Sequence, residues 1–191
     1  MPAAPLYALI AVLAAAENVF PPAPADVAVA LGAFLAGRGA LNAWLIFGIT
    51  WIANAGSGAA VYALARRHAT LVTTGAVGRR IFTPAVLAHV EEQYRRHGIY
   101  GIFISRLLPV WRAVVMPFAG IAHVSPARAL IPMALASGAY YGALTFVVSE
   151  LGTDFDAVLA FLGHVNAALA IVAGALVLII VIWIVRRRRP K

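Results

Sequence analysis

Apolar segments of two lengths alternate along this sequence, and this alternation restricts its fold more than any other feature. Residues 41–65 and 127–149 are long enough to cross a bilayer, which takes about 20 residues in a helix. Four shorter apolar segments cannot cross as single helices: 6–16, 27–37, 99–105 and 113–122. Hydrophobic residues make up 63% of the 191 residues and charged residues 12%, against about a quarter charged in a soluble domain. We therefore expect an all-α membrane protein.

This composition excludes several classes of protein. So few charges cannot cover the surface of a soluble cytosolic domain, and a disordered chain or a nucleic-acid binder with a solvated basic face would be far more polar. The chain has no cysteine, which excludes disulfides, thiolate metal sites and a thiol nucleophile. His89, Glu92 and His97 do not form an H-E-x-x-H motif. We therefore expect no metal and no other cofactor.

A proline-rich, acidic break separates the first two short segments. It extends from Glu17 to Asp26 and holds Pro21, Pro22 and Pro24. Because proline lacks an N–H and clashes with the preceding turn, a helix cannot continue through this break. We expect the chain to turn back here and to form a re-entrant hairpin, because its flanking segments are too short to span.

A basic break separates the next two short segments. Arg106 and Arg112 flank Pro109, and Pro117 and Gly120 follow. In a straight helix, side chains six residues apart point to opposite sides. Pro109 interrupts that helix, so both guanidinium groups can reach one cavity, and Pro117 and Gly120 are expected to shape the same hairpin. A guanidinium group binds phosphate through two parallel hydrogen bonds.

The order of short pair and long segment occurs twice, which predicts an inverted repeat followed by one extra helix. The expected membrane domain, 1–152, has five parts: hairpin 6–37, helix 41–65, a cytoplasmic amphipathic segment 66–98, hairpin 99–122 and helix 127–149. Residues 153–191 are expected to form a C-terminal transmembrane helix with a basic tail. Since the two units start on opposite sides, their hairpins approach the midplane from opposite faces.

The basic residues predict the orientation of the chain. The arginines of segment 66–98, Arg128 and the tail 186–191 all fall on one side of the membrane in this topology, and Arg38 is the main exception. By the positive-inside rule this side is the cytoplasm. We therefore expect a multi-pass protein of the inner (plasma) membrane with its C-terminus in the cytoplasm.

The charged breaks are the candidate functional site. A charge near the bilayer centre costs about 2.5–3.5 kcal/mol on insertion scales, so four such charges are expected to pair, to meet water or to act. Arg106 and Arg112 are expected to bind an anionic head group. Glu17 and Asp26 are expected to take up protons or to pair with the arginines.

These residues resemble the DedA family, also called the VTT or SNARE-associated Golgi protein domain. Residues 17–26 are similar to the family's E-N-x-x-P-P-x-P-x-E/D segment, and residues 106–112 with 117–120 are similar to its R-F-x-P-x-x-R…P-x-x-A-G core. Further matches are Gly32, Gly56, Gly58, Tyr62 and the pair at 97–98. The resemblance covers about residues 17–152. It implies a flippase or scramblase for a lipid with an anionic head, such as undecaprenyl phosphate or a phospholipid, coupled to a proton or cation gradient.

Two other functions stay open. The same charges would suit a proton-coupled antiporter for ions or small solutes, and a non-transporting assembly factor would use them only as structural ion pairs. We expect no enzymatic activity, because the Pro-Ser-Gly-His stretch of lipid phosphatases is absent. The expected partners are the membrane lipid, protons or cations, and a second copy of the chain. Trp111, Tyr140 and Tyr141 are interpreted as membrane-interface anchors, and Gly56 and Gly58 as sites of close helix packing.

Overall fold

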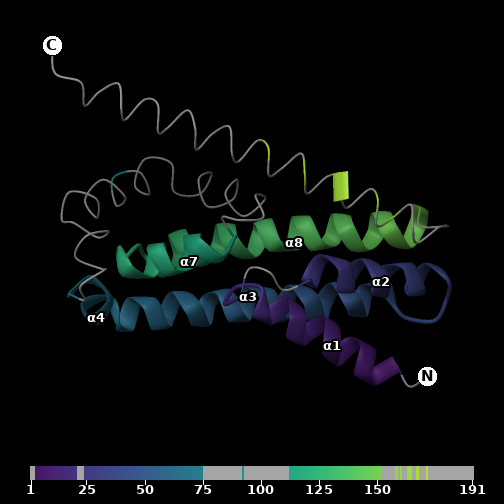
Figure 1. Ribbon diagram of the computed structural model, residues 1–191, viewed down its shortest axis with the longest axis horizontal. Coiled ribbons are helices and arrows are strands. Elements are labelled where there is room, and N and C mark those ends of the chain that lie inside the picture. Colours follow the sequence, from purple (N-terminus) through teal and green to yellow (C-terminus); the bar gives the residue numbers. More distant parts are fainter. Residues whose placement is uncertain are drawn as a thin grey trace, which may run out of the picture.

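The computed structural model describes residues 3–20, 24–74 and 112–151, together with 92, 158, 160, 163–164, 167 and 171, and the first three ranges hold six helices. Two of them, α3 (Ala43–Arg67) and α8 (Pro126–Leu151), form a long pair and lie side by side in opposite directions (Figure 1). A helix of this length rises about 38 Å, and the hydrocarbon core of a bilayer is about 30 Å thick. Both helices are long and apolar enough to cross a membrane.

The outward faces of the long pair are apolar. Trp44, Ile52 and Leu64 on α3 and Ile131 and Leu135 on α8 are all more than half exposed. The core helix of a soluble protein buries side chains of this kind, whereas a helix in contact with lipid leaves them on its surface. The length of the two helices and their apolar surfaces therefore indicate a location in a membrane.

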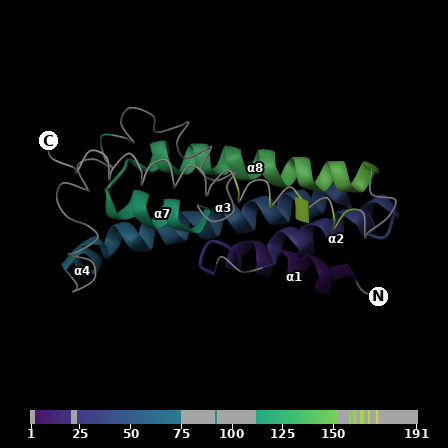
Figure 2. The same cartoon turned by 45° about the horizontal axis from the view of Figure 1, so that its top comes forward.

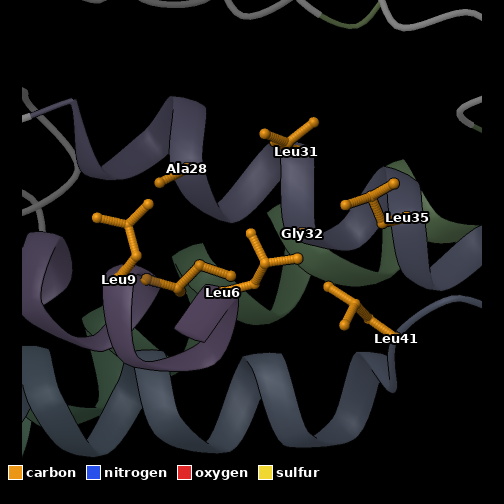
Figure 3. Close-up of a pocket in the computed structure, with 8 residues that line it drawn as sticks. Leu6, Leu9, Ala28, Leu31, Gly32, Leu35 and Leu41 are labelled. Carbon is orange, nitrogen blue, oxygen red and sulfur yellow. The ribbon is translucent and has the colours of Figure 1, made fainter. Parts of the chain in front are cut away.

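Two shorter helices, α1 (Ala3–Ala16) and α2 (Ala25–Gly37), form a hairpin at one end of the long pair (Figures 1 and 2). Each rises only about 20 Å. α1 packs on α3, and α2 packs mainly on α8. Apolar side chains line a groove between them (Figure 3): Leu6, Leu9, Leu31, Leu35 and Leu41. At Gly32 an added Cβ would lie 2.6 Å from Ile10 Cδ1, so this glycine allows α1 to approach α2.

The opposite end of the long pair is covered by α7 (Arg112–Ile121), and α3 continues into the short helix α4 (Ala69–Thr74). α7 packs on the C-terminal part of α3. An added Cβ at Gly120 would lie 2.5 Å from Tyr62 O and 2.9 Å from Arg66 N, so the two backbones touch here. Pro117 lies inside α7, which continues through it.

The helices α2 and α7 occupy corresponding positions. Just as Gly120 of α7 contacts the backbone of α3, an added Cβ at Gly37 of α2 would collide with the backbone of Ser149 in α8. Gly37 and Gly120 are 83 residues apart in the sequence, and the same separation relates Asn42 to Ser125, the residues that precede α3 and α8. Each of the two helices therefore packs on the long helix of the other half of the chain.

The turns that lead into the long helices are also alike. In each turn, two successive N–H groups return to carbonyls of the preceding helix, from Gly39 and Ala40 after α2 and from His123 and Val124 after α7. This is the Schellman pattern, in which the residue that follows the C-cap adopts a left-handed conformation. Gly39 has φ 76° and His123 has φ 52°. A histidine therefore stands where a glycine is favoured.

The prediction of an all-helical fold is confirmed for the described residues. The predicted helices 41–65 and 127–149 correspond to α3 and α8, each shifted by no more than two residues at either end. The short segments 6–16 and 27–37 correspond to α1 and α2, and 113–122 corresponds to α7. Segment 99–105, all of the amphipathic stretch 84–97 except residue 92, and most of 153–191 lie outside the described residues.

Candidate functional site

The carboxylate of Glu17 is the centre of the candidate site. The backbone N–H of Glu17 continues the ladder of α1 to Leu13 O at 3.2 Å, and only 8% of the residue is exposed. Its Oε2 accepts hydrogen bonds from Asn54 Nδ2 of α3, at 3.2 Å, and from the Tyr141 hydroxyl of α8. One side chain at the end of α1 thus joins the hairpin to both long helices.

Amide and hydroxyl groups around Glu17 bond to one another. Asn18 Nδ2 donates to Asn54 O at 2.9 Å and to Ser57 Oγ at 2.7 Å. Asn54 Nδ2 also donates to Ala14 O at 3.1 Å, and its Oδ1 accepts from Ser137 Oγ at 2.9 Å. A buried polar group left without a partner costs about 1–3 kcal/mol. These contacts therefore stabilise the position of the hairpin between α3 and α8.

The Glu17 cluster lies halfway along the long helices. We use this name for Glu17, Asn18, Asn54, Ser57, Ser137 and Tyr141. Asn54 and Ser137 are each the twelfth residue of their helix, which places them about 17 Å from its first residue. Polar side chains in membrane helices face the interior of the bundle and hydrogen-bond across helices, and an ionisable one such as Glu17 is a candidate functional residue.

A spacing of four residues brings these side chains to the interior, because residues i and i+4 share one face of a helix. The buried residues of α3 follow this spacing throughout: Ile46, Thr50, Asn54, Gly58 and Tyr62. On α8 the corresponding series is Met133, Ser137, Tyr141 and Thr145, all of them buried. These two series of buried residues, in which polar and apolar side chains alternate irregularly, face each other between α3 and α8.

The glycines of α3 differ in their surroundings. An added Cβ at Gly58 would lie 3.2 Å from Met133 Cε and 3.5 Å from Asn18 Oδ1, so the prediction of close packing is confirmed there. At Gly56 an added Cβ would meet no atom of the described residues within 4 Å. Among the described residues, the prediction of close packing is therefore wrong at Gly56.

The interpretation of Tyr141 as an interface anchor is also wrong. Tyr141 is 2% exposed, and its hydroxyl donates to Glu17. The sequence analysis likewise missed Asn54 and Ser137 as members of the site. Their signal was present, because both are polar residues inside candidate spanning segments and each has a further polar residue four positions away.

Other predicted site residues lie at the start of α2 or in α7. Asp26 is half-buried in the first turn of α2, where a carboxylate is favoured by the helix dipole. Pro24 immediately precedes this helix, and its carbonyl accepts the N–H of Ala28 at 3.1 Å. Pro117 and Gly120 lie in α7, far along α3 from Asn54.

The remaining predicted site residues are outside the description. Pro21, Pro22, Arg106 and Pro109 lie outside the described residues, and the structure describes only the backbone of Arg112, which begins α7. In the described part of the chain, no group of three or more His, Asp or Glu side chains could hold a metal ion.

A second polar contact fixes the turn between α7 and α8. Arg66 Nη1 donates to Val124 O and to the Tyr62 hydroxyl, both at 2.8 Å, and Tyr62 donates to the same carbonyl. Arg66 is thus engaged with the backbone of a turn. We assign it a structural role.

The chain has distant relatives of nearly the same length. It is 25% identical over 194 residues to an "Alkaline phosphatase-like protein" of Lactococcus lactis subsp. lactis (strain IL1403). The aligned region covers 97% of this chain and 89% of the relative. It is 23% identical over 190 residues to a protein of the same name from Lactococcus lactis subsp. cremoris (strain MG1363), with 95% and 87% covered. No family model matches the chain, and no solved structure matches it.

Proposed function

We propose that this protein is a secondary transporter that moves a lipid with an anionic head group across the bilayer, as the resemblance to the DedA family implies. The observation that carries the proposal is the position of Glu17. Its carboxylate is 8% exposed and lies at the middle of two helices of spanning length. Because inserting such a group into a membrane costs free energy, its presence there indicates a function. A proton-coupled transporter needs an acid at this depth.

In this proposal α1 and α2 form a re-entrant hairpin. Two properties of the hairpin support this. Each arm is too short to span, and its tip turns Glu17 and Asn18 inward while Val19 and Phe20 are 73% and 61% exposed. In water, a turn of this kind would expose its polar residues and bury its apolar ones. The reverse arrangement suits a tip at membrane depth.

The second half of the proposed inverted repeat consists of the basic hairpin and α8. The corresponding contacts of Gly37 and Gly120, and the like turns at Gly39 and His123, support it. Inverted repeats typically place the substrate site at the midplane, between the two units. Glu17 belongs to the first unit, Arg106 and Arg112 belong to the second, and Tyr141 of the second unit donates to Glu17.

The proposed cycle exchanges partners at this site. In the empty protein, Glu17 and Asp26 pair with the arginines or hold protons. An anionic head group then binds to the guanidinium groups, which hold phosphate through two parallel hydrogen bonds. The acids lose their arginine partners at this step and take up protons. Proton movement is thereby coupled to passage of the head group.

Lipid translocation in proteoliposomes tests this function. The full chain is reconstituted with a labelled polyisoprenyl phosphate or, separately, a labelled phospholipid, with and without a pH gradient. We expect one of the two lipids to cross faster than in protein-free vesicles, and the gradient to accelerate it. Arg112→Ala and Glu17→Gln should each abolish the gradient-dependent part, while Arg67→Ala, on an exposed residue at the end of α3, should not.

The same vesicles separate the alternatives. Phosphate released from the labelled lipid is measured in parallel, because the two Lactococcus relatives carry a phosphatase-like name. Hydrolysis by the wild type would replace transport with enzymatic activity. Movement of neither lipid by folded protein would favour the antiporter or the assembly factor.

A further inference from the structure

Two buried hydroxyl groups next to the Glu17 cluster have no hydrogen-bond partner in the described part of the chain. Thr50 Oγ1 and Thr145 Oγ1 are both fully buried, and neither has a hydrogen-bond partner among the residues the structure describes. A buried hydroxyl group without a hydrogen-bond partner costs about 1–3 kcal/mol of folding free energy. Each buried hydroxyl of this kind in a folded protein needs an explanation, and a bound water molecule is a common one.

Threonine in a helix has an easy way to avoid this cost, because its hydroxyl can bond to the carbonyl four residues before it. In α4 Thr73 and Thr74 do so, with Oγ1 at 2.9 Å from Ala69 O and at 2.7 Å from Thr70 O. Thr50 and Thr145 do not. Their hydroxyls are thus available to a group other than the helix backbone.

The two orphan hydroxyls lie on the same side of the Glu17 cluster. Thr50 precedes Asn54 by four residues in α3, and Thr145 follows Tyr141 by four residues in α8. Since the helices run in opposite directions, both steps lead toward the end of the bundle that carries the α2–α3 turn. Each threonine is therefore about 6 Å along its helix from a residue that donates to Glu17.

We infer that Thr50 and Thr145 hold buried water that connects the Glu17 cluster to this end of the bundle and delivers protons to Glu17. Water fits better than a metal cation, because two hydroxyls are too few oxygen ligands for a hard cation, whereas a buried water makes two to four hydrogen bonds. The inference rests on the proposed function in one respect, namely that Glu17 is the acid that carries the proton.

The transfer step needs no further reactant. A protonated water beside the threonines gives its proton to the Tyr141 hydroxyl oxygen. The Tyr141 O–H bond breaks at the same time, and that hydrogen passes to Glu17 Oε2, to which it is already hydrogen-bonded. Tyr141 stays neutral, Glu17 becomes a carboxylic acid, and the water is neutral again. Of the other titratable groups on the surrounding helices, Asp26 lies in the first turn of α2 and Glu150 in the last turn of α8. Tyr62 of α3 donates to Val124 O, and the Tyr7 hydroxyl of α1 accepts the N–H of Asn42.

Infrared difference spectroscopy of the full chain in liposomes, between acidic and neutral pH, tests this inference without a lipid substrate. We expect a carboxylic acid band that is missing in Glu17→Gln. We also expect a water band that shifts in water labelled with oxygen-18. The double variant Thr50→Val/Thr145→Val keeps the side-chain shape and removes both hydroxyls, so it should lose the water band.

After photorelease of protons, the carboxylic acid band should also rise more slowly in the double valine variant than in the wild type. The corresponding double serine variant keeps both hydroxyls and should restore the water band and the rate. Thr73→Val, which removes a hydroxyl bonded within its own helix, should change neither. An unchanged water band, or a wild-type rate in the double valine variant, would overturn the inference.

The outcomes are distinct from those of the transport assay. If the wild type shows both bands but moves no lipid, the proposed function fails and the water site stands. If lipid moves and the spectra do not depend on the threonine hydroxyls, the transporter stands and this inference fails.

Discussion

Asn54 and Ser137 are 83 residues apart in the chain, and their side chains hydrogen-bond at 2.9 Å where α3 and α8 cross. Trp51 Nε1 and Ala134 O, at 2.8 Å, have the same separation. In a two-fold arrangement, a residue that touches its own counterpart lies next to the axis. In the proposed inverted repeat, the axis therefore passes through the Glu17 cluster. The buried acid would then stand where both units meet.

The hydrogen bond from Tyr141 to Glu17 should contribute to stability. Tyr141→Phe removes the donor and leaves the Glu17 oxygen with one partner fewer, so we expect the free energy of unfolding to fall by about 1–3 kcal/mol. Unfolding of the purified protein in detergent measures this. Ser149→Ala is the control, since Ser149 Oγ bonds to Phe146 O within α8. Equal changes in both variants would contradict a special role for Tyr141.

The contact of Gly120 with α3 should tolerate no side chain. Gly120→Ala places a methyl group 2.5 Å from Tyr62 O, and the resulting shift of α7 should destabilise the protein by about 1–3 kcal/mol. Gly56→Ala is the matched change within α3, where the methyl group meets no described residue, and it should stabilise by about 0.5–1 kcal/mol. Thermal unfolding of both variants gives the comparison. A tolerated Gly120→Ala would argue against close contact of these helices.

Replacement of His123 by glycine should not lower the stability of the protein. Its φ of 52° is left-handed, which costs a side-chain-bearing residue about 1–2 kcal/mol relative to glycine. We expect His123→Gly to raise the melting temperature, and Gly39→Ala, at φ 76° in the corresponding turn, to lower it. A lower melting temperature for His123→Gly would mean that contacts of the imidazole outweigh the backbone strain.

Exchange of charges should not restore transport. If Glu17 and Arg106 were only a structural ion pair, the double variant Glu17→Arg/Arg106→Glu would recover activity lost in either single variant. Arginine has no acceptor, so it cannot receive the hydrogen bonds of Asn54 and Tyr141 that Glu17 accepts. We therefore expect the double variant to be inactive in the proteoliposome assay. Recovery to the wild-type rate would support the assembly factor.

The lengths of the apolar segments were sufficient to predict the helices, because a bilayer sets a minimum length for a spanning helix. They predicted α1, α2, α3, α7 and α8 within about three residues. Glu17 was found as a candidate because a charge within an apolar region is conspicuous. The roles of the other cluster residues were missed for the opposite reason. Asn54, Ser137 and Tyr141 are uncharged, and their helices have no neighbouring break to draw attention to them.

The pairing of helices could not be derived from the sequence. Nothing in the composition of α2 indicates that it packs mainly on α8 rather than on α3, its neighbour in sequence. The contact depends on small residues at single positions, such as Gly37 and Gly120, which bring backbones together. Glycines of α3 look alike in the sequence, yet Gly58 is packed and Gly56 is open. Only the three-dimensional arrangement distinguishes them.

The exchange of α2 and α7 between the two long helices has a consequence for biosynthesis. The ribosome delivers α1, α2 and α3 first, and at that stage the polar groups of Glu17 and Asn54 have neither Tyr141 nor Ser137 beside them. The first half of the chain therefore lacks these hydrogen bonds until α8 has been synthesised, more than fifty residues after the end of α3. A chain that stops before α8 would therefore lack the hydrogen bonds from Tyr141 and Ser137, and we expect it to be less stable than the complete chain.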